Sequence, residues 1–386
     1  MRHLRRADHP PPRAHAHAHA PAALSRRGPG RLLLALGLAA GCASAPAPSP
    51  DAAPRPAAAA VRRATLAEVG LDATALDRSA DPCRDFYQFA CGGWLARAAL
   101  PDDKPYVERG FDAISDRNEA RLRALAEGAA ASADPAVKRV GDYYAACVDE
   151  AAVERAGLSG VEPLLRRARG VRDPASLVAA IAELHRHGAW APFEARDEQD
   201  FRNATRVIVT LDQGGLGLPD RDYYVNDDAS AKELRAKYLA HVERTFGLAG
   251  RKAPEAKRAA ADVLALETEL AKASKTPLER RDPGGMYNKV DRAGLAALAP
   301  HVDWDAYFRG LGFPDAREVN VTAKAFFAAL DRAVVTFGPA AWSSYLEWHA
   351  LRRSAAALPK AFVDEAFALE QALTGQKRQR ERWKRC

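Results

Sequence analysis

The feature that most constrains the fold is a spacing of three or four residues between apolar side chains, which recurs along most of the chain. It is clear after Asp173, where Leu177, Ile181 and Leu184 fall on one helical face. Asp173 is followed by proline, and this pair is a typical helix start, because the carboxylate caps free N–H groups and proline fits the first turn. The same pair occurs at Asp134. We therefore predict a mainly α-helical fold.

Several further segments have the same spacing. A capping box of Ser230 with Glu233 is predicted to open one of these helices. The other predicted apolar faces consist of Val137, Val140, Tyr144 and Cys147; Leu234, Tyr238 and Val242; Val263, Leu266 and Leu270; Phe327, Leu330 and Val334; and Trp342, Tyr345 and His349.

One segment interrupts the helical pattern. β-Branched residues dominate residues 205–213, TRVIVTLDQ, so a strand is the better prediction there. Residues 190–194 can pair with this strand across a polar turn around residues 197–203. The predicted fold is a helical lobe with one small β-hairpin.

The N-terminal 41 residues are typical of a bacterial lipoprotein signal peptide. A short apolar run, RLLLALGLAAG, follows several arginines and ends at Cys42, the predicted site of lipid attachment. The run is shorter than the about 20 residues that span a bilayer. The alternative is a short hydrophobic helix that ends in cysteine by chance. We predict an Ala/Pro-rich tether over 42–70, a folded domain over 71–386, and a protein exported and lipid-anchored in the cell envelope, on the periplasmic side or at the outer membrane.

The positive charge of the chain belongs mainly to this leader. Residues 1–41 hold seven arginines and one aspartate, so they carry +6 of the total net charge of +7. The remaining residues are close to neutral. The charge therefore gives no reason to predict a nucleic-acid partner.

Two cysteines lie eight residues apart in the helical-looking segment DPCRDFYQFACGGW, in which two glycines then interrupt the run. A helix would separate Cys83 and Cys91 by roughly 12 Å, whereas a disulfide needs Cα atoms within about 7 Å. If the segment is helical, the two cannot pair with each other. Each then has a distant partner or stays reduced.

Zinc peptidase chemistry is not visible in the histidines. It requires HExxH, in which two histidines one helical turn apart bind the metal and the glutamate polarises a water molecule. None of the ten histidines is followed by glutamate. We predict structural or surface roles for His185, His187, His241 and His349.

Two further patterns are weak. Gly215 and Gly217 imitate the start of a dinucleotide-binding loop, but the third glycine is missing and Pro219 intervenes. The closing residues 376–386, QKRQRERWKRC, look like the exposed face of a helix that ends in a buried anchor.

Four segments are more specific together. They are DPCRDFYQFACGGWL (81–95), LDQGGLGLPDRDYY (211–224), ERRDPGGMYNKV (279–290) and RWKRC (382–386). In this order they resemble the neprilysin and endothelin-converting-enzyme family of zinc metallopeptidases. The first two are highly specific and the others are supporting. The resemblance runs from about residue 77 to the last residue, and it matches the N-terminal region of a two-lobed, largely helical peptidase that cleaves peptides in an internal cavity.

The resemblance implies a zinc cofactor in the full-length enzyme, bound by residues located after the point where this sequence stops. The chain alone is then expected to bind no zinc and to be inactive, and its partners would be peptide substrates and a missing C-terminal catalytic domain. The resemblance also implies a disulfide between Cys147 and Cys386, worth on the order of 4 to 5 kcal/mol in the chain-entropy model. It leaves Cys83 and Cys91 without their partners, as free thiols.

Members of this family carry an arginine just before a Phe-Asp pair, which helps bind the terminal carboxylate of the substrate. Here Phe111 and Asp112 form that pair, but the nearest arginine, Arg109, is displaced, and Ser115 stands where a second arginine often lies. The resemblance therefore makes Arg109 a candidate substrate-binding residue. The alternative is a surface arginine at a helix start.

The sequence thus supports two hypotheses. The first is the N-terminal region of a zinc metalloendopeptidase without the zinc-binding half, which predicts exposed apolar surface where a catalytic lobe docks. The alternative is a stand-alone, lipid-anchored helical lipoprotein that acts as a peptide-binding or scaffold module. It predicts a compact domain without such a surface.

Overall fold

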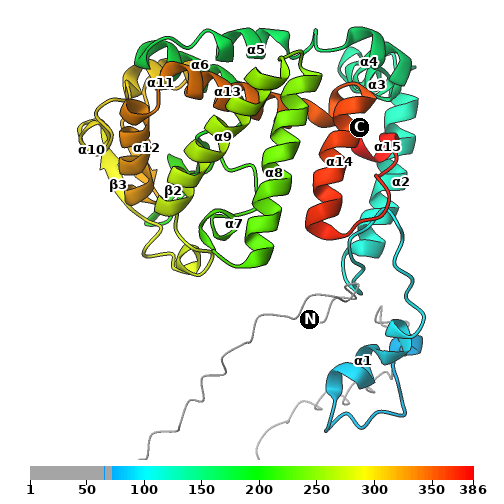
Figure 1. Ribbon diagram of the computed structural model, residues 1–386. Helices are drawn as coiled ribbons and strands as arrows, with labels where there is room; N and C mark the ends of the chain where they lie inside the picture. The colour runs from blue at the N-terminus through cyan, green and yellow to red at the C-terminus, as the bar shows by residue number, and fades with distance from the viewer. Residues whose placement is uncertain (1–64, 66–71) are drawn as a thin grey trace, which may run out of the picture. The chain divides into compact units, whose positions relative to one another are not determined.

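The computed structural model in Figure 1 describes residue 65 and residues 72–386. The chain divides into two compact units, and the boundary falls between Ala98 and Ala99. The predicted signal peptide, the lipidation site Cys42 and, apart from Thr65, the predicted tether lie outside the described residues. In the part of the chain that is described, no helix combines the length and the hydropathy needed to cross a membrane.

The described part of the smaller unit holds the 3-10 turn η1 (Ala73–Ala75) and helix α1 (Phe86–Leu95). The Asp85 side chain caps α1 by accepting a hydrogen bond from the Gln88 N–H, so Cys83 lies in the turn before the helix and not within it. The predicted helical spacing of Cys83 and Cys91 is therefore wrong. The predicted interruption at the glycines is also wrong, because the helix continues through them. A Cβ on Gly93 would lie 2.4 Å from the Thr74 carbonyl oxygen, so glycine lets α1 pack against η1.

The larger unit is mainly helical, as predicted. Its elements in chain order are α2 (Asp112–Ala129), α3 (Pro135–Val148), α4 (Glu150–Ala156), α5 (Glu162–Arg169), α6 (Pro174–Arg186), β1 (Phe193–Asp200), β2 (Asn203–Gln213), α7 (Asp222–Val225), α8 (Ala229–Leu248), α9 (Ala253–Ala273), η2 (Glu279–Arg281), β3 (Lys289–Asp291), α10 (Arg292–Leu298), α11 (Trp304–Leu311), β4 (Glu318–Val321), α12 (Lys324–Thr336), α13 (Pro339–Ser354), η3 (Ala355–Ala357), α14 (Lys360–Thr374) and α15 (Arg382–Arg385).

The helix starts that the sequence marks with Asp-Pro are confirmed. Asp134 and Asp173 cap α3 and α6, and Asp173 forms a capping box with Ser176. The start of α8 differs from the prediction, because Asp228 caps this helix by accepting from the N–H three residues later. Ser230, the predicted cap, therefore lies inside the first turn.

The predicted hairpin is confirmed, and it belongs to a four-stranded sheet of order β1-β2-β4-β3. Strands β1 and β2 are antiparallel, with Phe193 opposite Gln213. Strand β1 is longer than predicted, so the turn is confined to residues 201–202 and does not extend over 197–203. Strand β4 runs parallel to β2 and antiparallel to β3. Strands β3 and β4 are too short for their alternation to be read from the sequence.

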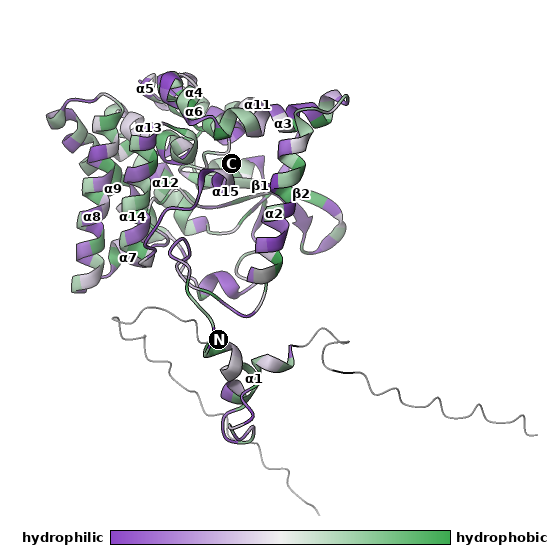
Figure 2. Ribbon diagram, turned by 90° about the vertical axis from the view of Figure 1, so that its right-hand side faces the viewer, coloured by the Kyte–Doolittle hydropathy of each residue, from purple (hydrophilic) through white to green (hydrophobic). Residues whose placement is uncertain are grey.

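The core of the larger unit lies among α6, α9, α12 and α13 and the sheet, and the contacts of α9 with α8, α12 and α13 build its centre (Figure 1). In Figure 2 these helices carry hydrophobic segments in green beside hydrophilic segments in purple, as amphipathic helices do. The predicted faces of α6, α9 and α13 are buried. The face of α3 is buried only in part, since Tyr144 is buried but Val137 and Val140 are 43% and 57% exposed.

The closing residues are not the long helix face that the sequence predicts. Residues 376–381 are non-helical, and only α15 forms a short turn of helix. Gly375, at φ 74°, ends α14, and the chain then folds back so that the Lys377 and Arg378 N–H groups donate to the Asp102 carbonyl. Lys384 pairs with Asp103 at 2.8 Å. Basic side chains therefore anchor this segment.

Candidate functional site

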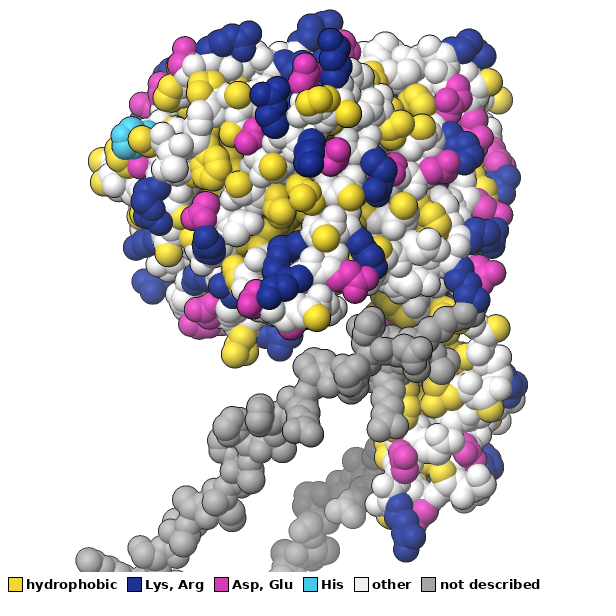
Figure 3. Space-filling view, viewed as in Figure 1, with side chains coloured by type: hydrophobic (Ala, Val, Ile, Leu, Met, Phe, Trp, Pro, Cys, Tyr) yellow, Lys and Arg dark blue, Asp and Glu magenta, His cyan; other side chains and the backbone are white. Residues whose placement is uncertain are grey.

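A cavity of 820 Å³ lies at the open end of the β1–β2 hairpin, where β1 begins and β2 ends. It is lined by parts of four segments, 188–194, 213–221, 274–280 and 349–353. They come from the loop between α6 and β1 with the start of β1, the end of β2 and the loop after it, the loop after α9, and the end of α13. The second segment falls in the motif LDQGGLGLPDRDYY. On the face drawn in Figure 3, Lys and Arg side chains in dark blue are interspersed with yellow hydrophobic patches.

Two glycines hold the loop after β2 against buried tyrosines. Gly215 has a φ of 69°, and its carbonyl accepts a hydrogen bond of 2.7 Å from the Tyr345 hydroxyl. A Cβ on Gly215 would lie 2.1 Å from that hydroxyl, and a Cβ on Gly217 would lie 1.9 Å from the hydroxyl of Tyr238. Glycine is therefore required at both positions by the close approach of the backbone, and not by a nucleotide.

A buried carboxylate, Glu267, holds several side chains next to the cavity, and of these only His349 lines the cavity itself. Glu267 is fully buried, and it accepts hydrogen bonds from the hydroxyls of Tyr224 at 2.7 Å and Tyr238 at 2.8 Å. The Nε2 atom of His349 lies 3.1 Å from the same carboxylate. Burial and the nearby charge of Glu267 raise the pKa of both tyrosines, so their hydroxyls stay protonated and donate. Burial lowers the pKa of His349, which keeps it neutral.

The charge of the lining is predominantly positive. The cationic side chains are Arg221, Lys275, Arg280, Arg352 and Arg353, and the acidic ones are Glu194 and Asp220. Two cations have carboxylate partners, since Arg280 pairs with Asp212 at 2.9 Å and Arg221 with Asp222 at 3.0 Å. The other three, Lys275, Arg352 and Arg353, form no salt bridge with any residue that the structure describes.

Arg109, the predicted substrate-binding residue, lies in an exposed bend just before α2 and does not line this cavity. Its role in carboxylate binding stays a prediction. The structure joins Cys147 to Cys386 in a disulfide with a Cα–Cα distance of 5.8 Å, and among the described cysteines Cys83 and Cys91 are free thiols. This disulfide links α3 to the C-terminal turn α15.

The histidines form structural contacts in the described part of the chain. His185 is buried, with Nδ1 at 2.8 Å from the Tyr307 hydroxyl and Nε2 at 3.1 Å from the Ala191 carbonyl. Burial lowers the pKa of His185 to about 3, so the ring is neutral. His241 lies 2.8 Å from Glu365. Among the described residues, no group of three or more His, Cys, Asp or Glu side chains is placed to hold a metal ion. These residues therefore do not fit a zinc site.

Comparison with known proteins now identifies the family. The sequence profile of peptidase family M13 matches residues 82–386. The chain belongs to peptidase family M13. Members of this family are zinc-dependent metallopeptidases, and the matched part is their N-terminal region.

Relatives of known sequence and structure agree with this M13 assignment. The chain is 32% identical to human endothelin-converting enzyme-like 1 and 28% identical to human endothelin-converting enzyme 1, in each case over 81% of this chain and 42% of the relative. It is 32% identical to the zinc metalloprotease Zmp1 of Mycobacterium tuberculosis, solved with an inhibitor, with a TM-score of 0.76. That match covers 82% of this chain and 49% of the other. The chain thus spans less than half the length of these relatives.

The cavity is the part of this M13 region that sequence reasoning missed. Its cations come from segments as far apart as Arg221 and Arg353, and nothing in their spacing shows that they meet. A partial signal was present, because two of the family motifs, 211–224 and 279–290, supply Arg221 and Arg280. The presence of two family motifs in these segments could have pointed to this region. It gives no information about the charge of the cavity.

Proposed function

We propose that this chain is the N-terminal region of a zinc-dependent metalloendopeptidase that hydrolyses peptides. A separate catalytic domain is proposed to supply the zinc-binding residues and the glutamate base. The observation that carries this proposal is the structural match to a zinc metalloprotease, with a TM-score of 0.76 over 82% of this chain but only 49% of the other. The described residues supply no metal-binding cluster, so no catalytic step is assigned to them.

Exposed apolar residues on α2 and α3 give this proposal independent support. Leu122 and Leu125 on α2 are 63% and 69% exposed, and Val140 and Tyr143 on α3 are 57% and 72% exposed. Each pair is spaced by three residues, so it forms a stripe on its helix. An unpaired apolar surface of this kind marks a protein interface. A catalytic domain that covers these stripes accounts for them, whereas a stand-alone scaffold lipoprotein does not.

The proposal extends to location. We propose export of the protein and lipid attachment at Cys42, so that the peptidase is anchored in the cell envelope. Labelling of cells with an alkyne-bearing fatty acid tests this part separately. The wild-type chain is expected to take up the label, and a Cys42→Ala variant is expected not to. Equal labelling of the two proteins would contradict the anchor.

Genomic sequence and a zinc assay test the enzymatic part. We expect the coding sequence downstream of the Cys386 codon to encode an HExxH motif in the same reading frame. We also expect the purified chain to bind no stoichiometric zinc by native mass spectrometry and to leave a quenched fluorescent peptide intact. Co-expression with the downstream domain should produce hydrolysis that a chelator abolishes. Chelator-sensitive hydrolysis by the chain alone would overturn the division of roles, and a stop codon with no downstream HExxH would favour the scaffold alternative.

A further inference from the structure

The cavity at the end of the β1–β2 hairpin has three cations, Lys275, Arg352 and Arg353, that form no salt bridge with a described residue. Arg352 and Arg353 lie in the last turn of α13, where the partial negative charge of a helix C-terminus favours positive side chains. The Nε atom of Arg353 donates to the Gly188 carbonyl at 3.0 Å, which fixes the side chain while leaving terminal N–H groups of the guanidinium for another acceptor. Arg352 is exposed and forms no salt bridge with a described residue.

Lys275 is held in place on a different wall of the cavity. Its backbone N–H donates to the Gln213 side chain at 2.7 Å, and its carbonyl accepts from the same amide at 3.1 Å. Its Nζ atom donates to the Gly285 carbonyl at 2.6 Å, and no carboxylate among the described residues pairs with it. An ammonium group carries three donors, so it can still bind an anion. Cations from α13 and from the loop after α9 therefore line one cavity.

The size and the remaining lining of the cavity indicate a ligand larger than a single ion. A volume of 820 Å³ lies within the range of about 300 to 1,000 Å³ that is usual for organic ligands. Trp190, which is 40% exposed, lines the cavity together with Leu216, Leu218 and Pro277. A ligand that matches this surface has carboxylates and hydrocarbon groups at once.

We propose that this cavity binds an acidic peptide segment, with its carboxylates on Lys275, Arg352 and Arg353 and its apolar side chains beside Trp190. This proposal rests on the proposed peptidase function for the kind of ligand only, since a region of a peptidase meets peptides. The Arg353 and Lys275 side chains are already held by hydrogen bonds to the Gly188 and Gly285 carbonyls, so binding requires little rearrangement.

A binding assay with charge-matched peptides tests the proposal on the full chain. The probe is a fluorescein-labelled octapeptide of alternating glutamate and leucine, and its partner has glutamine in place of every glutamate. We expect the acidic peptide to bind more tightly by at least about tenfold in fluorescence anisotropy, and this difference should shrink at high salt. Equal affinity for the two peptides would overturn the proposal.

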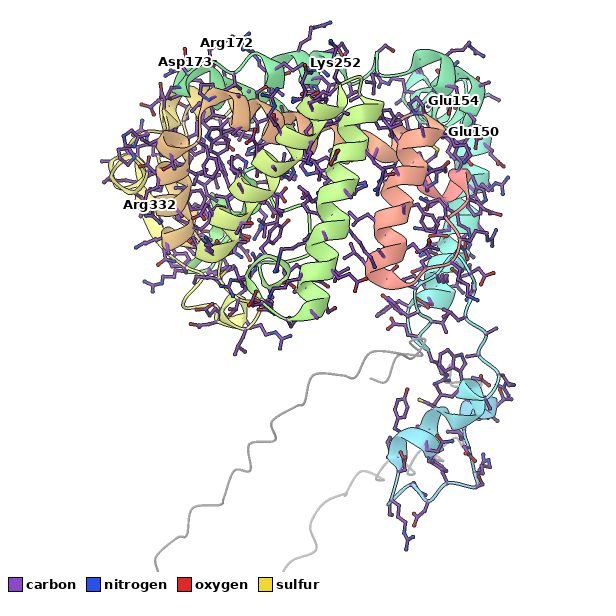
Figure 4. The ribbon with its side chains drawn as sticks, in the orientation of Figure 1. Glu150, Glu154, Arg172, Asp173, Lys252 and Arg332 are labelled. Atoms are coloured by element: carbon purple, nitrogen blue, oxygen red, sulfur yellow. A yellow bond between two sulfur atoms is a disulfide. The ribbon has the colours of Figure 1, made fainter. Side chains whose placement is uncertain are left out.

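Substitutions locate the binding. Arg352→Gln and Arg353→Gln are each expected to weaken the affinity for the acidic peptide by about fivefold. The matched control is Arg332→Gln on α12 (Figure 4), because Arg332 is exposed, forms no salt bridge with a described residue, and does not line the cavity. We expect this control to bind as the wild type does. A control that weakens binding as much as Arg352→Gln would show general charge attraction and contradict the site.

Inorganic phosphate separates a peptide site from a small-anion site. If phosphate binds in isothermal titration with a dependence on Arg352 and Arg353, while the acidic peptide does not bind, the cavity holds small anions and the proposal is wrong. The assays measure binding and not hydrolysis. A failure of the proposed peptidase function therefore leaves these binding results unchanged, and absent binding does not bear on the zinc chemistry.

Discussion

At the scale of single residues, burial accounts for the polar groups that interrupt the apolar helix faces. His185, His241 and His349 are all buried beside a hydrogen-bonding partner, and burial lowers the pKa of each. A buried imidazole is tolerated because it stays neutral and its ring nitrogens are paired. The sequence correctly indicated structural roles, but it could not name the partners, which lie on other elements and loops of the fold.

His185 makes stability depend on pH. Below pH 6.5 the ring is protonated in the unfolded chain but stays neutral in the folded protein until about pH 3. Unfolding then takes up a proton, so stability falls as the pH decreases, by up to about 1.4 kcal/mol per pH unit. We expect His185→Gln to show a shallower decrease in the free energy of unfolding between pH 6 and 4, measured by urea denaturation.

The control for this slope is His187→Gln, because His187 is about half exposed. It should keep the wild-type slope. The slope and not the absolute stability is compared, since His185→Gln also changes the contact with Tyr307. A wild-type slope in His185→Gln would show that other groups cause the pH dependence.

The glycines of the cavity loop give a second residue-scale prediction. Gly217→Ala places a methyl group 1.9 Å from the Tyr238 hydroxyl, so we expect it to destabilise the fold by about 1–3 kcal/mol. Gly247→Ala near the end of α8 is the matched control, because its Cβ would meet nothing within 4 Å. It should be neutral or stabilising. Thermal unfolding compares the two, and equal effects would contradict the packing argument.

At the scale of elements, local signals predicted what local interactions determine. The starts of α3 and α6 were readable because aspartate caps and proline act within one turn. Strands β3 and β4 were not, because they have only three and four residues and exist through pairing with distant segments. The cavity escaped prediction for the same reason, since its lining forms only when α9, α13 and the hairpin come together.

The disulfide that joins α3 to the C-terminal segment gives a prediction at the scale of elements. It spans a sequence separation of 239, so replacing Cys147 and Cys386 with serine should lower the free energy of unfolding by about 2–5 kcal/mol. Trypsin should also cut sooner within residues 376–386, which hold several lysines and arginines. Cys83→Ser with Cys91→Ser is the control, because both are free thiols. The free energy of unfolding is measured by urea denaturation. If the variant without Cys147 and Cys386 unfolds at the same urea concentration as the wild type, the disulfide does not stabilise the larger unit.

At the scale of the whole molecule, the exposed stripes of α2 and α3 connect the fold to the proposed function. A helix normally turns its apolar side chains inward, yet α2 and α3 pack on each other and still leave apolar side chains in contact with solvent. Gly141 makes the close packing possible, because a Cβ there would lie 2.1 Å from the Ala130 nitrogen. The side chains on the outer surface of this pair are then available to a catalytic domain.

The exposed stripes of α2 and α3 predict that the isolated chain associates with hydrophobic molecules and with itself. We expect it to bind the dye ANS and to self-associate in sedimentation experiments, and the double variant Leu122→Glu and Leu125→Glu should reduce both effects by removing the stripe on α2. Val335→Glu on α12 is the control, because Val335 is 61% exposed but lies outside these stripes. The double variant should also weaken co-purification with the proposed catalytic domain, whereas the control should not. Dye binding that falls equally in both variants would mean that scattered exposed residues cause it, and the stripes of α2 and α3 would then no longer support a docked catalytic domain.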